Sequence, residues 1–320
     1  MTARGFSFSV ASPTGQMLYY DVTSETTVSV VNPDWDYYSM PSGRLEIPST
    51  VTYSGSTFAV TAISQRAFSN CSDITHVIVP QSVRTIGTLA FFSCTSLDTI
   101  DLPSTIDSIA SEAFNNSGYY NNMANWVDNT TLYVGDYLVR VRTSVTGSVT
   151  IREGTLGIGG MAMYNCHSMS EVVVPQSMRF IGALTFKDCS SLDTIHMLGT
   201  NPPTLATTAI NTNSSITVKV PCGSLGAYTT APNWNAQHIV EATCPDGIEN
   251  IENGRPLIDV TATGIVVCGA EGKTLSVCDM IGRHIAQVGN ASVTQYIDLP
   301  HTGVYVIVVD GSKSVKVIYL

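Results

Sequence analysis

The sequence has few charged residues and no long apolar run. Only 12% of its 320 residues are charged, about half the share in an average soluble domain. Asp and Glu outnumber Lys and Arg by 25 to 15, which gives a formal net charge of −10. A chain without a basic surplus lacks the electrostatic footprint that nucleic-acid phosphates require. No window reaches the roughly 18 to 20 apolar residues of a bilayer-spanning helix. We therefore expect no nucleic-acid partner and no membrane-spanning segment.

The usual sequence marks of catalysis and metal binding are also missing. The chain contains no G-x-S-x-G elbow, no H-E-x-x-H helix and no C-x-x-C pair, which argues against a serine hydrolase, a zinc protease and a tetrahedral zinc site. The glycine-rich stretch Gly154–Gly160 has no P-loop Lys after it, so it does not predict a phosphate site. We predict that the protein is not an enzyme and that it holds no metal and no cofactor.

What the sequence does contain is a repeat of 23 residues. Ala67, Phe68 and Cys71 recur as Ala90, Phe91 and Cys94. The same shift relates further apolar residues: Ile63, Ile86 and Ile109; Ile158 and Ile181; and the pairs Val149/Ile151, Val172/Val174, Ile195/Met197 and Val218/Val220. The step from Ile109 to Ile158 is 49 residues, two periods plus three (2 × 23 + 3). We interpret the extra residues as a small insertion.

Each repeat contains the L-x-x-L-x-L strand of a leucine-rich repeat, for example Ile74-x-x-Val77-x-Val79. Alternate residues of a strand face opposite sides, so we expect Val77 and Val79 in the core and His76 and Ile78 outside. One unit cannot bury its apolar face alone, so the units must stack and both ends need caps.

A glycine also recurs at one repeat position, as Gly87, Gly159 and Gly182. We expect it at the tight bend of each coil.

The predicted fold is mainly β, of the α+β class: a leucine-rich repeat solenoid of 23-residue repeats with an N-terminal β cap and a C-terminal β-sandwich. Two stretches within residues 1–60, Leu18–Val22 and Thr26–Val31, alternate with period two, which predicts that residues 1–60 form the cap and the entry to the repeats. Residues 61–243 form the solenoid, with an insertion near 115–131. Residues 247–320 contain alternating strands and turns without the repeat, which predicts a separate β-sandwich domain.

The repeat units, such as Ala-Ile-Ser-Gln-Arg-Ala-Phe-Ser-Asn-Cys-Ser-Asp-Ile at 62–74, closely resemble the BspA-like leucine-rich repeats of Bacteroidetes surface proteins. This resemblance covers about residues 41–243 and implies adhesion or binding of host proteins or other cells. The segment Leu-Ser-Val-Cys-Asp-Met-Ile-Gly-Arg at 275–283 resembles the C-terminal sorting β-sandwich of type IX secretion cargo, which implies an envelope or extracellular address. The repeat motif itself encodes a scaffold and carries no ligand residues.

These resemblances predict a noncatalytic cell-surface or secreted adhesion and binding protein that presents its repeats to a host extracellular protein or glycan, as a monomer. Two alternatives stay open, a glycan-binding accessory protein and a purely structural envelope spacer. Met1–Arg4 has neither the basic region nor the apolar stretch of a signal peptide. We expect the natural secretory signal to lie outside this sequence.

One irregular repeat is the best candidate for a local binding feature. Ser117 stands where the repeat has Cys, and Gly118–Thr131 interrupts the unit. Tyr119, Tyr120 and Trp126 lie in this segment. Their rings suit stacking against a sugar, and packing over an exposed sheet edge is the alternative interpretation.

Four further candidate binding residues lie on the predicted outer face of the strands: His76, Asp101, Glu171 and His196. His76 and Asp101 stand on neighbouring turns and are expected to be close. His196 is several turns away, so no three-ligand metal cluster is predicted. A solvated polar face is the alternative interpretation.

One repeat position holds four of the eight cysteines: Cys71, Cys94, Cys166 and Cys189. Stacked turns bring such Cα atoms to about 5 Å, but parallel Cβ vectors cannot approach to the roughly 3.8 Å of a disulfide, so we expect buried thiols. Cys222 and Cys244 flank the closing segment of the solenoid. A disulfide between them would tie down that end.

Overall fold

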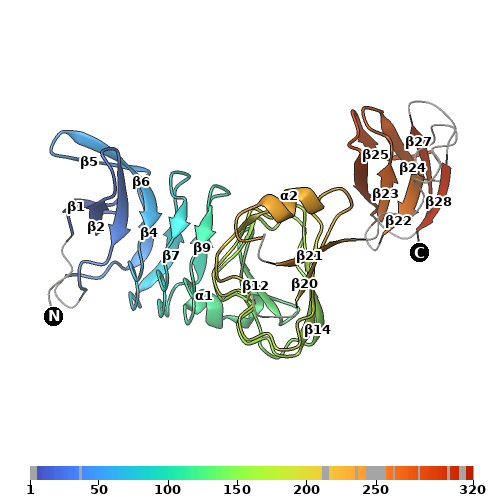
Figure 1. The fold of residues 1–320 in the computed structure, drawn as a ribbon. Helices are drawn as coiled ribbons and strands as arrows, with labels where there is room; N and C mark the ends of the chain where they lie inside the picture. Colours follow the sequence, from blue (N-terminus) through green and yellow to red (C-terminus); the bar gives the residue numbers. More distant parts are fainter. Residues whose placement is uncertain are drawn as a thin grey trace. The chain divides into compact units, whose positions relative to one another are not determined.

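The computed structural model describes residues 6–35, 38–210, 216–234, 237–242, 257–261, 264–279, 282–300, 303–309 and 315–319. The chain divides into two compact units, Met1–Val240 and Glu241–Leu320 (Figure 1). The helices in the described ranges are short: α1 (Gly118–Asn121), the 3-10 helix η1 (Met123–Asn125) and α2 (Leu225–Thr230). None of the described helices has the length and apolar character needed to cross a membrane.

A β cap opens the first unit, as predicted. Strands β1 (Phe8–Ala11), β2 (Met17–Val22) and β3 (Thr27–Val31) are antiparallel. β3 then pairs in parallel with β6 (Ser56–Ile63), and β5 (Thr50–Tyr53) folds back on β6 as a hairpin. The buried side of this sheet is continuous with the core of the first coils, so the end of the solenoid is covered.

Each of the first coils contributes a strand to each of two parallel sheets. The strands with the L-x-x-L-x-L pattern, which we call motif strands, form a sheet in the order β4 (Gly43–Glu46), β7 (Ile74–Ile78) and β9 (Thr99–Asp101). On the other side, β6 continues into β8 (Thr85–Ile86) and β10 (Ser108–Ile109). Val77 lies opposite Ile100, so the pairing register of the sheet is the 23-residue period of the sequence.

The side chains of equivalent positions form columns through the core. The rings of Phe68, Phe91 and Phe114 stack with centroid separations of 5.2 and 5.6 Å and interplanar angles of 12° and 3°. Each of these rings is buried. The predicted alignment of repeat positions is therefore confirmed, because rings that are 23 positions apart in the sequence come into contact when successive coils stack.

A second stack of coils follows the irregular repeat. Its motif strands are β14 (Gly147–Thr150), β16 (Met169–Val174), β18 (Thr194–Met197) and β20 (Thr217–Val220), closed by β21 (His238–Glu241). The opposite sheet contains β11 (Trp126–Val127), β12 (Thr131–Val134), β13 (Tyr137–Val141), β15 (Gly157–Ile158), β17 (Phe180–Ile181) and β19 (Thr204–Leu205). The fully buried rings of Tyr228 and Trp234, on α2 and just after it, close this end of the core.

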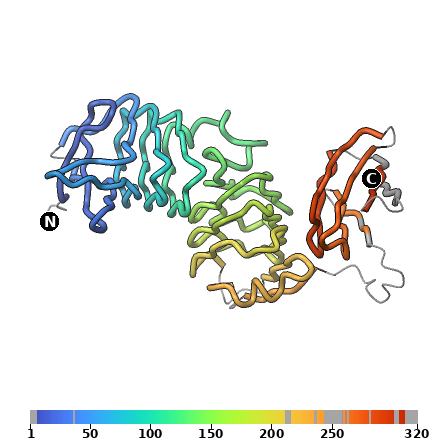
Figure 2. Tube along the Cα trace, turned by 90° about the horizontal axis from the view of Figure 1, so that it is seen from above, coloured from blue at the N-terminus to red at the C-terminus, as the bar shows by residue number. Residues whose placement is uncertain are grey.

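The run of coils changes direction between the two stacks, as Figure 2 shows. On one side the stacks remain joined, because the Gly160 N–H donates to the Ile109 carbonyl at 2.9 Å. On the other side the sheet of motif strands stops at β9, and a separate sheet starts at β14. The chain leaves the repeat pattern between these two sheets through α1 and η1, where the Gly118 N–H donates to the Cys94 carbonyl, whereas the hairpin β12–β13 belongs to the opposite sheet. Because the two stacks are hydrogen-bonded to each other on one side and their motif-strand sheets are separate on the other, the run of coils bends between them.

The sequence spacing indicated two regular coils with three added residues, and the structure shows a different division. The Gly159 N–H donates to the Leu138 carbonyl at 2.8 Å, just as Gly87 N–H donates to Ile63. Leu138 therefore occupies the column position that precedes Ile158 and pairs with it, while Ile109 reaches the same coil through the Gly160 N–H. The 49 residues divide into a long coil of 29 (138 − 109) and a short one of 20 (158 − 138), and the long coil contains the inserted segment.

Each regular coil also contains two residues in the left-handed region at fixed positions. One column is Arg66, Leu89, Glu112, Met161 and Leu184, with φ between 57° and 59°, and the other is Asn70, Ser93, Asn116, Asn165 and Asp188. At these positions the backbone N–H is directed to the next coil: Arg66 N–H donates to the Thr88 carbonyl and Leu89 N–H to Ser111. The hydrogen bonds between coils offset the cost of this conformation for residues with a Cβ.

The second unit contains two antiparallel sheets around its own core. One sheet consists of β22 (Leu257–Val260), β23 (Gly264–Cys268) and β26 (Thr294–Asp298); the other consists of β25 (His284–Val288), β24 (Leu275–Asp279), β27 (Gly303–Val309) and β28 (Val315–Tyr319). Ile265, Leu275, Val277 and Tyr305 are fully buried in the core that the two sheets share. This is the predicted β-sandwich.

Candidate functional site

The histidines of the motif strands form two separate pairs with carboxylates. His76 Nε2 on β7 lies 2.8 Å from Asp101 Oδ2 on β9, the neighbour that the sequence predicted. His196 Nε2 on β18 lies 3.9 Å from Glu171 Oε1 on β16. The first pair belongs to the first stack and the second pair to the second stack, so the structure does not bring these four residues together. In the part of the chain that the structure describes, no three His, Cys, Asp or Glu side chains are grouped to hold a metal ion.

The irregular repeat begins with a serine that caps a helix. Ser117 Oγ donates to the Phe114 carbonyl at 2.8 Å and accepts the Tyr120 N–H at 3.1 Å. A cysteine at this position, as in the other repeats, is a much weaker acceptor. The loss of the repeat cysteine therefore starts α1 and directs the chain out of the solenoid.

The three aromatic side chains of the segment have different roles. The Tyr119 hydroxyl donates to the Tyr133 carbonyl at 2.8 Å, and burial raises the pKa of this phenol. Its ring packs against the core of the first stack. Tyr119 is therefore a packing residue, in line with the alternative interpretation of the sequence.

The Trp126 side chain packs against Tyr120 and Arg142, and its ring face is not open for stacking against a sugar. Its side chain is only 7% exposed, and its indole N–H donates to the Tyr120 carbonyl at 2.8 Å. The Tyr120 ring meets it edge-on, with centroids 5.4 Å apart. The Arg142 guanidinium lies over its face, 4.6 Å from the ring centroid. Such a cation–π contact covers the face that a sugar would need.

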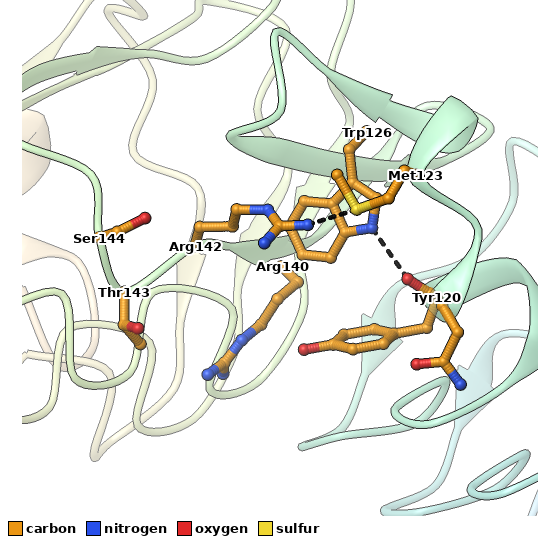
Figure 3. A pocket seen from close by; sticks show the side chains of 8 residues that line it. Tyr120, Met123, Trp126, Arg140, Arg142, Thr143 and Ser144 are labelled. Atoms are coloured by element: carbon orange, nitrogen blue, oxygen red, sulfur yellow. Dashed lines mark hydrogen bonds between the residues drawn. The ribbon is translucent and has the colours of Figure 1, made fainter.

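These side chains border a hollow of about 370 Å³ in the surface of the first unit (Figure 3). We call it the arginine hollow; its lining residues are Tyr120, Asn121, Met123, Trp126, Arg140, Arg142, Thr143 and Ser144. Figure 3 shows Arg140 and Arg142 between the two rings on one side and Thr143 and Ser144 on the other. Tyr120 is half-buried, and Asn121, Thr143 and Ser144 are exposed. The hollow therefore combines two cations, a partly open ring and several small polar groups.

The backbone of β13 explains why both arginines line one hollow. Val141, the last residue of the strand, is fully buried between them. Since alternate residues of an extended chain project to opposite sides, Arg140 and Arg142 both project away from the core side that takes Val141.

The guanidinium groups have few partners within the protein. Arg140 Nη1 donates to the Met161 carbonyl at 2.7 Å. Arg142 Nη2 lies 2.6 Å from the thioether of Met123, a weak acceptor. The Nε of Arg142 is buried and meets no acceptor among the described residues. Neither arginine takes part in an ion pair there, whereas Arg152 lies 3.8 Å from Asp136. A guanidinium has five N–H donors, so most of these donors remain unused.

A second hollow of about 470 Å³ lies beside the edge of the second stack. Val127 and Thr131 of the inserted hairpin line one side of it, and Ser148 and Thr150 of β14 line the other. β14 is the terminal strand of its sheet. This hollow contains both Asp128 and Arg152, so its charge is mixed, unlike that of the arginine hollow.

The cysteines of the repeat position are buried thiols, as predicted. Cys71, Cys94, Cys166 and Cys189 are free and buried, and the Cys94 thiol lies 3.1 Å from the Phe68 carbonyl of the preceding coil. Cys222 is disulfide-bonded. Cys244 lies outside the described residues, so the pairing of these two cysteines stays a prediction.

Neither arginine of the hollow was predicted as a site residue from the sequence. A signal was present, because Arg140-x-Arg142 places two cations of one strand side in a chain that has only 15 Lys and Arg residues. The two arginines point to a binding site only when the structure shows that no acidic side chain among the described residues pairs with them.

The register of the parallel strands and the columns of equivalent side chains define a leucine-rich-repeat solenoid. The chain belongs to the BspA-type leucine-rich-repeat family, whose region matches in six copies over residues 61–193 and 121–229. Residues 247–319 match a second family, described as a domain of unknown function (DUF6383). The resemblance of this domain to type IX sorting domains stays a prediction.

Several solved structures are similar to the chain. A leucine-rich-repeat protein of T. pallidum is 23% identical, with a TM-score of 0.30, over 61% of this chain and 70% of that chain. A leucine-rich-repeat protein from Bacteroides ovatus is 16% identical, with a TM-score of 0.33, over 74% and 77%. A leucine-rich cell surface protein from Faecalibacterium prausnitzii is 15% identical, with a TM-score of 0.26, over 76% and 97%. No curated protein matches the chain.

Proposed function

We propose that the protein is a noncatalytic binding protein of the cell surface or the extracellular space, with the solenoid as a scaffold. Membership of the BspA-type repeat family supports a scaffold role. One similar structure is that of a leucine-rich cell surface protein, which supports the location. The repeats supply a rigid frame whose outer face is polar, and such frames present broad binding surfaces.

The observation that carries the proposal is the arginine hollow. The inserted segment lies outside the 23-residue pattern and builds, with β13, an open site lined by two arginines whose side chains contact the Met161 carbonyl, the Met123 thioether and the Trp126 ring. A chain that served only as a spacer would gain nothing from two arginines without acidic partners, because their mutual repulsion is unfavourable. We place the specific contact with a host protein or another cell at this interruption of the repeats.

Glycan binding is a second candidate, and the lining of the hollow favours it. Tyr120 offers part of an aromatic ring, and Asn121, Thr143 and Ser144 offer exposed amide and hydroxyl groups. Sites of this kind combine an apolar surface with a few polar groups that fix orientation.

The test is retention of the full chain on immobilised extracellular-matrix proteins and on a glycan array. We expect one of the two classes to retain the chain, and Tyr120→Ala to weaken that retention while the chain stays folded. Tyr53→Ala is the matched control, because Tyr53 is an exposed tyrosine on the hairpin of β5, outside the hollow. Absence of retention by both classes would favour the envelope-spacer alternative.

The proposed location has its own test. Surface exposure is checked by digestion of intact cells with an added protease, which should remove the solenoid while a cytoplasmic marker survives. A variant that lacks residues 247–320 tests the sorting role proposed for the second unit. If the domain sorts the protein, this variant should accumulate inside the envelope and resist the protease; unchanged exposure would exclude that role.

A further inference from the structure

We propose that the arginine hollow binds a carboxylate-bearing sugar, a uronic or sialic acid residue of an acidic glycan, with the carboxylate held by Arg140 and Arg142. The inference rests on the proposed binding function and specifies the ligand class of the same site.

The charge balance of the hollow points to an anion. The whole chain carries a net charge of −10, yet none of the residues that line this hollow is acidic. Two guanidinium groups on one side of one strand repel each other, and a bound carboxylate would replace that repulsion by attraction. The planar fork of arginine matches a carboxylate in a bidentate geometry.

The free donors are directed by the surrounding structure. The Arg142 guanidinium rests over the Trp126 ring, 4.6 Å from its centroid, and the indole N–H of Trp126 is in turn held by the Tyr120 carbonyl. The Met161 carbonyl holds Arg140 through Nη1. Both side chains are therefore restrained before a ligand arrives, so less conformational entropy is lost on binding.

The rest of the lining fits a sugar ring. Tyr120 stands beside the arginines with its ring half-buried, and Thr143 and Ser144 lie on the other side of the arginines (Figure 3). Asn121 follows Tyr120 in α1 and also lines the hollow, and the three polar residues are exposed. Sugar hydroxyls both donate and accept hydrogen bonds, which amide and hydroxyl side chains also do. A volume of about 370 Å³ lies at the lower end of the range for small-ligand sites, as expected for one terminal sugar residue.

An acidic peptide fits this hollow less well. Peptides in extended form commonly bind by adding a strand to a free sheet edge. β13 has β12 on one side and β15 on the other, so the strand that carries both arginines has no free edge. The free edge of β14 belongs to the second hollow, where the charge is mixed.

The test is titration of the full chain with D-glucuronate and with N-acetylneuraminate, followed by saturation-transfer NMR. D-glucose, inorganic sulfate and a Glu-rich peptide serve as comparison ligands. We expect at least one of the two acids to bind saturably and at least about tenfold more tightly than D-glucose, since charged hydrogen bonds dominate recognition here. The two acids separate the uronic from the sialic source of the carboxylate.

Variants then test whether Arg140 and Arg142 supply the positive charge that binds the carboxylate. Arg140→Gln and Arg142→Gln should each weaken binding about tenfold or more, and Arg142→Lys should recover only part of the loss because it keeps the charge and loses the fork. Arg44→Gln is the matched control, because Arg44 lies on β4 outside the hollow, in an exposed pair with Glu46 at 3.7 Å. Thr143→Trp keeps both arginines and fills the hollow from an exposed position. It should also abolish binding, which covers the case in which Arg142→Gln unfolds.

Several results would overturn the inference. These are equal binding of D-glucose, equal or tighter binding of sulfate alone or of the Glu-rich peptide, absence of saturable binding of either acid, or an Arg44→Gln effect as large as that of the hollow variants. If the full chain is retained on matrix proteins or neutral glycans and the arginine variants are retained equally, the acidic-sugar inference fails while the binding function stands. If nothing retains the chain, both fail.

Discussion

Gly182 shows how closely neighbouring coils approach. A Cβ at this position would collide with the Gly160 backbone nitrogen and lie 2.8 Å from the carbonyl carbon of Gly159. Gly87 is in the same situation against the backbone of Gln65. Neither glycine has a left-handed φ, so a special backbone conformation is not the reason for glycine at these two positions. Gly87 and Gly182 have no room for a Cβ because two backbones lie in contact at these coils.

Replacement of Gly182 by alanine should therefore destabilise the solenoid. The obstructing atoms belong to backbone, which cannot rotate away, and overpacking of this kind costs about 1–3 kcal/mol. Gly226→Ala is the control, because Gly226 lies in α2 with nothing within 4 Å of its Cβ direction, and alanine should stabilise a helix by up to about 1 kcal/mol. Chemical denaturation of both variants measures the difference. A Gly182→Ala protein as stable as the original would contradict the close contact.

The buried thiol of Cys94 should make the free energy of unfolding depend on pH in the alkaline range. Burial raises the pKa of its thiol from 9.0 to about 12. At pH 8 the folded protein should hold roughly a thousandfold less Cys94 thiolate than the unfolded chain. Above about pH 9 the unfolded chain loses this proton and the folded protein retains it, so the free energy of unfolding falls as pH rises. The thiol contributes its full stabilisation below pH 9 and loses it between about pH 9 and 12.

Two measurements check this expectation. A disulfide reagent at pH 8 should leave Cys94 unmodified in the folded protein and modify it in denaturant, while the half-buried Cys278 of the second unit reacts in both. The loss of stability between pH 8 and pH 10.5 should be shallower in Cys94→Ala than in the original protein. An identical slope in the two proteins would show that Cys94 does not titrate between the two states.

At the scale of the coil, the columns of apolar residues were predictable and the left-handed columns were not. The Phe68, Phe91 and Phe114 stack follows from the 23-residue period, because each coil needs a large apolar side chain at the same place. Arg66, Leu89 and Glu112 have φ angles of 57–58°. Residues so different in chemistry give no sequence signal, since the conformation is imposed by hydrogen bonds to the next coil.

The left-handed column predicts an unusual effect of glycine. Arg66 is exposed and has a φ of 58°, so Arg66→Gly should be more stable than Arg66→Ala by about 1 kcal/mol. The same pair of substitutions at Arg84, which is exposed but has no left-handed φ, should give the opposite order. Thermal melts of the four variants decide the matter. If glycine is the worse substitution at both positions, the left-handed conformation of Arg66 is not a source of strain.

The arginine hollow marks the limit of sequence analysis at the scale of elements. The sequence locates the interruption and its aromatic residues, because both break a regular pattern. It gives no register for the hairpin β12–β13, which contains an irregularity between Leu132 and Tyr133. That register decides that Val141 is buried and that its two arginine neighbours line the hollow. The side of a strand that a residue faces changes with a shift of one position.

At the scale of the whole molecule, the two units should unfold independently. Each contains its own buried core, and Glu241 is the first residue of the second unit. We expect residues 1–242 and residues 247–320 to fold when produced separately. Calorimetry of the full chain should show two transitions at the melting temperatures of the separate pieces. A single transition, or a piece that does not fold, would show that one unit requires the other.

The interruption of the repeats has a consequence for how such a protein changes over generations. Because most contacts of a regular coil are with its immediate neighbours, coils far from the inserted segment can be gained or lost in either stack without disturbing the place where the two stacks join. The length of the solenoid and its proposed binding site are thus encoded in different stretches of the gene. In evolution, either stack can be lengthened in steps of 23 residues while the inserted segment stays the same. The inserted segment can likewise be replaced while both stacks stay the same.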